Sequence, residues 1–178
     1  MGLSRGAPGP YNAPMLNKPQ ITSELRRSLD LMIPFFDWDA EMLRKSYAPG
    51  KWTAKEILLH VVDTELVLHT RARFILAEPY VQIVPFDQDK WARTLAYKQR
   101  SLALARRTWT TNRETLIELV DLVPEPLFGR EGNHPEHPSY RAWDVVNYVE
   151  SHARHHYGQL LAIRDGLPWP APKPAPSE

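Results

Sequence analysis

Hydrophobic residues recur every three or four positions through most of this chain, and proline-rich segments separate the stretches that show the pattern. This period is typical of amphipathic helices. No segment alternates between hydrophobic and polar residues for long enough to predict a strand; the best candidate, YVQIVPF at 80–86, is one short run. The pattern predicts helices over about 21–35, 39–47, 53–78, 87–122 and 139–166, with a bend left open within 87–122.

Local signals mark where several of these helices begin and end. Thr53 and Glu56 form the sequence of a capping box, with a hydroxyl at the N-cap and a carboxylate three residues later. Ser139 is the expected N-cap of the last helix, and Gly166 its expected end. Pro79 stops the second long helix, and 124–138 is expected to be a loop.

Four long helices and one short one predict an all-α protein with the architecture of a four-helix bundle. Prolines crowd both ends of the chain, where they disfavour helices. We therefore expect a Pro/Gly-rich N-terminal tail at 1–19, one metal-binding helix bundle at 20–167 and a Pro-rich C-terminal tail at 168–178.

The composition narrows the possible functions. The 178 residues carry a formal net charge of +1 with no basic blocks, so we expect no nucleic-acid partner. The absence of cysteine excludes disulfides, thiolate metal ligands and a cysteine nucleophile. The N-terminus lacks the apolar core of a signal peptide, and no apolar run approaches the ~20 residues that cross a bilayer. We expect a cytoplasmic protein with no membrane partner.

Three of the seven histidines fall within SHARHHYGQL at 151–160. His152 and His156 continue the apolar stripe of the last predicted helix, whereas His155 lies about 100° further round. Two imidazoles at i and i+4 can reach one metal ion, as they do in zinc-binding helices. This segment has no glutamate between the ligands to act as a general base. An exposed or hydrogen-bonded histidine pair explains the spacing equally well.

A third histidine favours the metal hypothesis. His60 lies on the inward stripe of the second long helix, and facing helices of a bundle bring such side chains together. Three buried imidazoles without partners would be costly, and a divalent cation satisfies them together. Three protein ligands with one open position are typical of a catalytic rather than a structural site. Candidates for contacts with the ligands or the substrate are Asp63, Thr64 and Gln159.

The other histidines are weaker candidates. His134 and His137 occupy the proline-rich loop, where we expect them to be solvated. His69 follows His60 by nine residues and so faces another side of its helix. Arg71 and Arg154 could bind substrate carboxylates, although exposure at the surface explains both.

The stretches KWTAKEI at 51–57 leading to His60, PFDQD at 85–89 and SHARHHYGQ at 151–159 resemble the DinB-like (YfiT-like) metalloenzyme superfamily. The resemblance spans roughly 21–166. It implies a four-helix bundle that holds zinc, nickel or another divalent metal such as iron, manganese or cobalt, with His60, His152 and His156 as the ligands. It also implies a homodimer. Characterised members of the superfamily include S-transferases that use bacillithiol or mycothiol, and a mycothiol-dependent isomerase.

Three functions remain open at this stage. The first is a metal-dependent transferase of a low-molecular-weight thiol, in which an external thiol and a small-molecule substrate meet at the metal. The second is a metal-dependent hydrolase, with Glu56, Asp63 or Glu65 as the general base. The third is a non-enzymatic metal-binding or stress-response protein, which a fourth ligand such as His155 would favour.

Overall fold

The computed structural model describes residues 15–78, 80–137 and 139–170. It confirms the all-α bundle, since these residues contain isolated β-bridges but no strand. Four long helices build the bundle: α1 (Lys18–Met32), α3 (Ala54–Ala77), α5 (Leu102–Leu122) and α6 (Ala142–Asp165). The short elements are η1 (Ile33–Asp37), α2 (Ala40–Arg44), α4 (Gln88–Thr94) and η2 (Glu125–Gly129). No helix in these three ranges is long and apolar enough to span a membrane.

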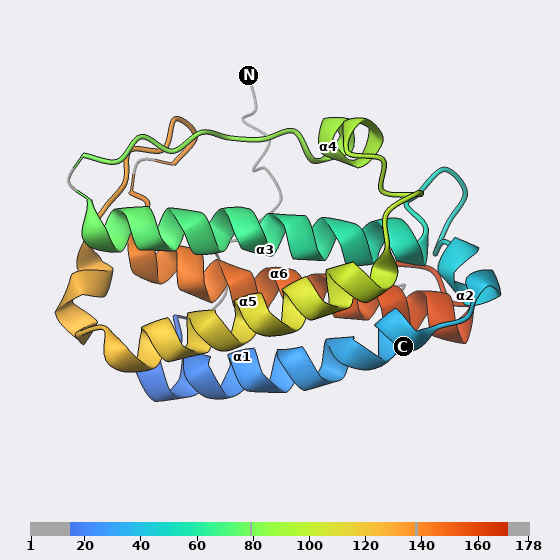
Figure 1. Ribbon diagram of the computed structural model, residues 1–178, viewed down its shortest axis with the longest axis horizontal. Coiled ribbons are helices and arrows are strands. Elements are labelled where there is room, and N and C mark those ends of the chain that lie inside the picture. The colour runs from blue at the N-terminus through green and yellow to red at the C-terminus, as the bar shows by residue number, and fades with distance from the viewer. Residues whose placement is uncertain (1–14, 79, 138, 171–178) are drawn as a thin grey trace, which may run out of the picture.

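The order of the helices in space differs from a simple up-and-down bundle (Figure 1). α3 packs against α5 and α6, and α1 packs against the same two helices. α1 and α6 run in one direction, and α3 and α5 run together in the other. Because α3 and α5 are parallel neighbours, the chain must return along the outside of α3 before α5 begins. Residues 80–100, which include α4, make this return, and we call them the crossover segment.

Side-chain caps fix most of the helix starts. Thr53 and Glu56 form the predicted capping box of α3, and Asn17 and Gln20 form another at the start of α1. α1 therefore begins three residues before the predicted position 21, with Pro19 in its first turn, where a missing N–H costs nothing. The predicted N-cap Ser139 is wrong, because Arg141 occupies that position and its backbone N–H donates to Asp144.

The predicted helix over 87–122 is interrupted. α4 ends at Thr94, and Ala96 adopts a φ of 52°, in the left-handed region that breaks a helix. The Ser101 hydroxyl then accepts a hydrogen bond from the Leu104 N–H and starts α5. The hydrophobic pattern continues through 87–122, so it does not reveal the break. The cap at Ser101 marks where the second helix begins.

A buried ion pair separates two hydrophobic clusters of the core. The guanidinium of Arg113 (α5) donates from Nε to Glu65 Oε1 of α3 at 2.8 Å and from the other side of the fork to Oε2 at 2.5 Å. It also donates to the Ser28 hydroxyl of α1 and lies 4.4 Å from the centre of the Trp109 ring. Both charged side chains are buried, so the pair links three helices in the interior.

Candidate metal centre

Three imidazoles converge between α3 and α6. Nε2 of His152 lies 3.0 Å from Nε2 of His60 and 3.1 Å from Nε2 of His156. Each of the three residues offers a ring nitrogen within 4.8 Å of the other two. His60 and His156 are buried and His152 is partly buried. The structure thus brings together the three histidines that the sequence singled out, although they come from helices about ninety residues apart along the chain.

Neighbouring side chains hold two of the rings in place. Gln159 Oε1 lies 2.8 Å from Nδ1 of His156, so this nitrogen carries the proton and Nε2 presents its lone pair toward His152. The Thr64 hydroxyl lies 3.3 Å from Nδ1 of His60. The Trp52 ring packs at 4.7 Å from the His60 ring. These contacts orient the imidazoles as second-sphere groups do in metal sites.

Burial keeps the three imidazoles neutral. It lowers the pKa of His60 from 6.5 to about 3 and that of His156 to about 4, and it lowers the pKa of His152 well below its ordinary value. The neighbouring histidines add to the effect, because each would repel a second positive charge. At neutral pH all three rings therefore have lone pairs available for a cation.

The donor set fits a divalent metal. Nitrogen ligands at about 2.0–2.1 Å from a tetrahedral zinc lie about 3.3 Å apart, close to the separations between these Nε2 atoms. Hydrogen bonds cannot satisfy all three nitrogens at once, because His152 Nε2 cannot donate to one neighbour and accept from the other. Three imidazole nitrogens suit zinc, nickel, copper and iron.

A cavity of about 570 Å³ opens onto the triad from one side. Its polar lining comes from the loop before α3, from the start of α4 and from α6. Tyr148 stands at 5.5 Å from the His152 ring, Lys51 and His155 are exposed, and Asp89 is the only carboxylate among the described lining residues. The triad therefore has an accessible side on which a small molecule fits.

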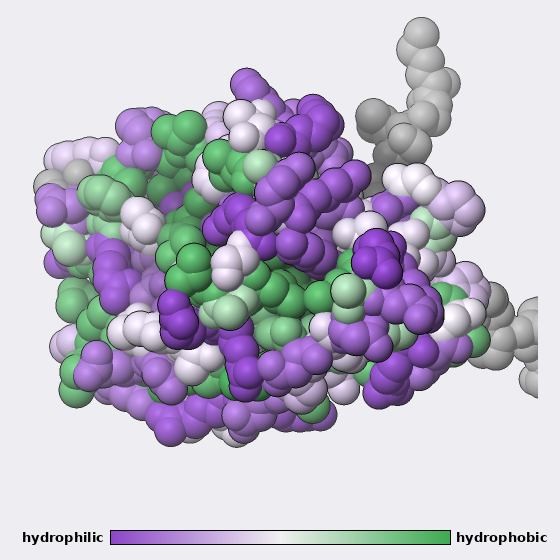
Figure 2. Space-filling view, turned by 45° about the vertical axis from the view of Figure 1, so that its right-hand side comes forward, coloured by the Kyte–Doolittle hydropathy of each residue, from purple (hydrophilic) through white to green (hydrophobic). Residues whose placement is uncertain are grey.

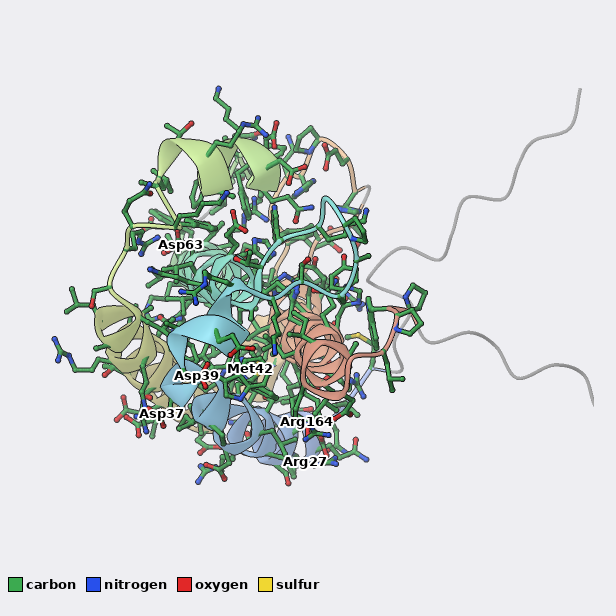
Figure 3. The ribbon with its side chains drawn as sticks, turned by 90° about the vertical axis from the view of Figure 1, so that its right-hand side faces the viewer. Arg27, Asp37, Asp39, Met42, Asp63 and Arg164 are labelled. Carbon is green, nitrogen blue, oxygen red and sulfur yellow. The ribbon has the colours of Figure 1, made fainter. Side chains whose placement is uncertain are left out.

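The candidate partners of the ligands divide into two groups. Thr64 and Gln159 contact the triad, as described above. Asp63 does not: it forms an ion pair with Arg100 at 2.6 Å and lines a different cavity. Figure 3, a view along the bundle, places Asp63 on the side of α3 away from α6.

None of the three carboxylates suggested as general bases lines the triad cavity. Glu56 accepts hydrogen bonds from both the backbone N–H and the hydroxyl of Thr53. Asp63 is paired with Arg100, and Glu65 with Arg113. Each is held by another partner: Glu56 by the cap of α3, and Asp63 and Glu65 by arginines.

His155 and His69 lie where the sequence predicted. His155 is exposed on the flank of α6, 3.3 Å from the Gln159 amide nitrogen, and is not one of the converging nitrogens. His69 is buried beside Asn112, away from the triad.

The expectation of a solvated loop is wrong for His134, which is buried against Tyr140. His134, Glu136 and His137 also bring ligand atoms within 4.8 Å of one another. However, Nδ1 of His134 accepts a hydrogen bond from the Glu136 N–H, so the neutral ring carries its proton on Nε2. Because Glu136 is exposed as well, this cluster is better explained as a folded turn than as a metal site.

Several residues of the triad cavity had no role predicted from the sequence. Trp52, Tyr148 and the start of α4 at Gln88 and Asp89 line it. Trp52 directly precedes the capping box, which hinted at a structured helix entry. The contribution of α4 depends on the path of the crossover segment, which local sequence does not reveal.

Known proteins share this fold and sequence pattern. The family model described as "DinB superfamily" matches residues 24–160. A protein from Bacillus cereus (strain 03BB102) named "Putative metal-dependent hydrolase" is 30% identical over 139 residues, covering 75% of this chain and 76% of its own. A Bacillus mycoides (strain KBAB4) protein with the same descriptive name is 26% identical over 133 residues and covers the same shares.

Two solved structures show the same fold. YfiT from Bacillus subtilis, which has "an unusual four-helix bundle topology", superposes with a TM-score of 0.75 at 16% identity, covering 87% of this chain and 93% of YfiT. A mycothiol-dependent maleylpyruvate isomerase superposes with a TM-score of 0.66 at 12% identity, covering 82% of this chain and 61% of the isomerase. The family model that matches 24–160 and the relative that is 30% identical lead to one assignment: the chain belongs to the DinB superfamily.

Proposed function

We propose that this protein is a metal-dependent enzyme in which His60, His152 and His156 hold a divalent cation, with zinc or nickel as the leading candidates. The observation that carries the proposal is the convergence of three neutral Nε2 atoms beside a cavity of about 570 Å³. The metal-dependent names of the Bacillus relatives support the same class.

Within that class we favour transfer of a low-molecular-weight thiol to an electrophile. A divalent cation at such a site lowers the pKa of a thiol or water that reaches it. The chain contains no cysteine, so the thiol is a cosubstrate such as bacillithiol or mycothiol. The fold shared with a mycothiol-dependent isomerase supports a thiol partner.

The residues of the chain have distinct parts in this proposal. Gln159 and Thr64 orient the imidazoles, and Trp52 covers the His60 ring on one side. Lys51 and His155 stand at the cavity lining, where Lys51 offers a positive charge to a carboxylate of the thiol cosubstrate. Tyr148 fills the wall beside His152.

Hydrolysis of an ester or amide is the second candidate, favoured by the names of the relatives and by Asp89. This carboxylate lines the cavity and forms no ion pair with any of the described residues. In contrast, Glu56, Asp63 and Glu65 are each paired with a basic side chain. In this reaction Asp89 would accept a proton from an attacking water, and this role rests on its position in the same cavity as His152 and His156.

One pair of assays tests the proposal. Purified protein is loaded with zinc or nickel and given a panel of electrophiles with a small thiol, and separately a nitrophenyl ester without thiol. Thiol conjugation that needs the metal supports the transferase. Ester cleavage that needs no thiol and falls in Asp89→Asn supports the hydrolase. Metal-loaded protein that is inactive in both assays contradicts both reactions.

A further inference from the structure

A second and larger cavity, about 1010 Å³, lies between α3 and the crossover segment. One wall is the outer face of α3 from Asp63 to Phe74 with its C-cap Glu78, and the other is formed by 81–84, by Trp91 of α4 and by Leu95, which follows α4. Figure 2 shows hydrophobic side chains gathered in a hollow on one face of the molecule, with hydrophilic side chains around them. We call this cavity the α3 groove.

The α3 groove exposes large apolar side chains to solvent. Leu66, Phe74, Val84 and Leu95 are 40, 52, 77 and 41% exposed. Single exposed apolar residues are ordinary on a protein surface, but several around one concavity are typical of a binding site. A mostly apolar lining with a few polar groups, at this volume, is typical of pockets for small molecules.

Arg71 supplies a charge to this apolar wall. Its guanidinium donates to the Tyr140 hydroxyl at 3.2 Å and to the Val84 carbonyl at 2.6 Å, and it lies 5.9 Å from the centre of the Phe86 ring. These hydrogen bonds use two of the five N–H groups of an arginine.

Among the described residues, Arg71 has no acidic partner within ion-pair distance. The other arginine of the groove, Arg100, is paired with Asp63 at 2.6 Å. A half-buried guanidinium held in place by neutral acceptors, with donors to spare, is a receptor for an anion.

We propose that the α3 groove binds a free amphiphilic anion, with its apolar chain against Leu66, Phe74 and Leu95 and its carboxylate on Arg71. This site is distinct from the triad and does not depend on the proposed metal or reaction. A second copy of the chain fits the groove less well. If a symmetric dimer paired groove with groove, the two concave surfaces would leave both floors uncovered.

Calorimetric titration of the full chain with dodecanoate, below its micelle concentration, tests the proposal. We expect one molecule to bind, and dodecyltrimethylammonium, which has the same chain and the opposite charge, to bind at least tenfold more weakly. Arg71→Gln should weaken dodecanoate binding about tenfold or more, because a charge-assisted contact is lost. Arg71→Lys should retain most of the affinity. Arg73→Gln, an exposed arginine of α3 outside the groove lining, is the matched control and should bind like the parent.

Three results would overturn the proposal: no binding of dodecanoate, equal binding of the two amphiphiles, or equal losses in Arg71→Gln and Arg73→Gln. Thermal unfolding of each variant confirms that it is folded. A concentration-dependent dimer that Phe74→Asp abolishes, without any binding of dodecanoate, would assign the groove to a second copy instead. Metal content should not change in the Arg71 variants, so failure here leaves the triad unaffected.

Discussion

The side-chain oxygen of Gln159 lies 2.8 Å from Nδ1 of His156, while Nε2 of the same ring faces His152. Gln159 therefore fixes both the tautomer and the rotation of an imidazole that lies one turn before it on α6.

Gln159→Ala should lower metal affinity about 10- to 100-fold, the usual effect of removing a group that orients a ligand. Gln159→Glu should restore most of it, because a carboxylate oxygen also accepts from Nδ1–H. Competition with a chromophoric chelator measures the affinity. Gln99→Ala, at an exposed position before α5, is the control and should bind metal like the parent. Equal affinities in Gln159→Ala and Gln99→Ala would rule out the orienting role.

Alanine at any one of the three converging positions should remove most of the bound metal. His60→Ala, His152→Ala and His156→Ala each leave two imidazoles, and two ligands hold a divalent ion far less tightly than three. His155→Ala should keep a full complement, since its ring lies outside the triad. Elemental analysis of the purified variants gives the answer. Parental metal content in all three triad variants would exclude this site.

Metal-free protein should lose stability as the pH falls from about 7 toward 5. The folded-state pKa of His60 is about 3 and that of His156 about 4, against 6.5 in the unfolded chain. Between these values the unfolded chain binds protons that the folded protein does not, so the free energy of unfolding falls with pH. Each histidine contributes a slope of about 1.4 kcal/mol per pH unit.

Urea unfolding of chelator-treated protein at pH 7, 6 and 5 measures this slope. His60→Gln should reduce it, whereas Gln99→Ala, at an exposed position with no titratable group, should leave it unchanged. If the parent and His60→Gln lose stability at the same rate, the buried imidazoles are not the groups that titrate.

Removing one partner of the buried ion pair should be severe. Glu65→Ala leaves the Arg113 guanidinium buried without a carboxylate, which costs about 3–5 kcal/mol. Asp37→Ala, which breaks the exposed pair with Arg106, should cost at most about 1 kcal/mol. Chemical denaturation compares the two. Glu65→Leu combined with Arg113→Met should recover much of the loss, because no charge is then left unpaired in the interior.

Gly158 permits a close approach of the C-terminal segment to α6. A Cβ at this position would lie 2.6 Å from Cζ3 of the Trp169 ring and still closer to Cη2, so Gly158→Ala must displace that ring. Alanine otherwise favours a helix by about 1 kcal/mol over glycine. We therefore expect Gly158→Ala to stabilise the protein when Trp169 is alanine, and to show a smaller gain or a loss when Trp169 is present. A double-mutant cycle by thermal unfolding gives the coupling, and additive effects would contradict the contact.

Most of the bundle and the convergence of three histidines could be predicted from the sequence, because both depend on helical periodicity. The inward stripes of their helices carry His60, His152 and His156. Four long amphipathic helices bury their apolar faces by packing against one another. The break at Ala96 and the start of α6 at Ala142 could not be predicted in the same way. Alternative cap residues stand within a few positions of one another, and tertiary packing selects among them.

The surroundings of the triad were predicted less completely. Thr64 and Gln159 lie one turn from their histidines, so helix geometry suffices for them. Asp63 is also within one turn of His60, but it pairs with Arg100 of the crossover segment, and the sequence does not reveal this contact. Contacts between distant segments require knowledge of the helix order, and nothing in the local pattern distinguishes a parallel α3 and α5 from an antiparallel pair.

That helix order has a consequence for how new binding surfaces can arise in such bundles. Antiparallel neighbours are joined by a few residues at one end, and their outer faces stay bare. A parallel pair requires a connection that runs the length of the molecule, and here the crossover segment runs along α3 (Figure 1). Two contacts attach the crossover segment to α3: the Arg71 side chain donates to the Val84 carbonyl, and Arg100 pairs with Asp63. Between these contacts, Trp91 and Leu95 line the α3 groove. Mutations at Trp91 or Leu95 can therefore reshape the α3 groove without changing α3 and α6, which carry the triad, whereas Gln88 and Asp89 of the same segment also line the triad cavity and link the two pockets.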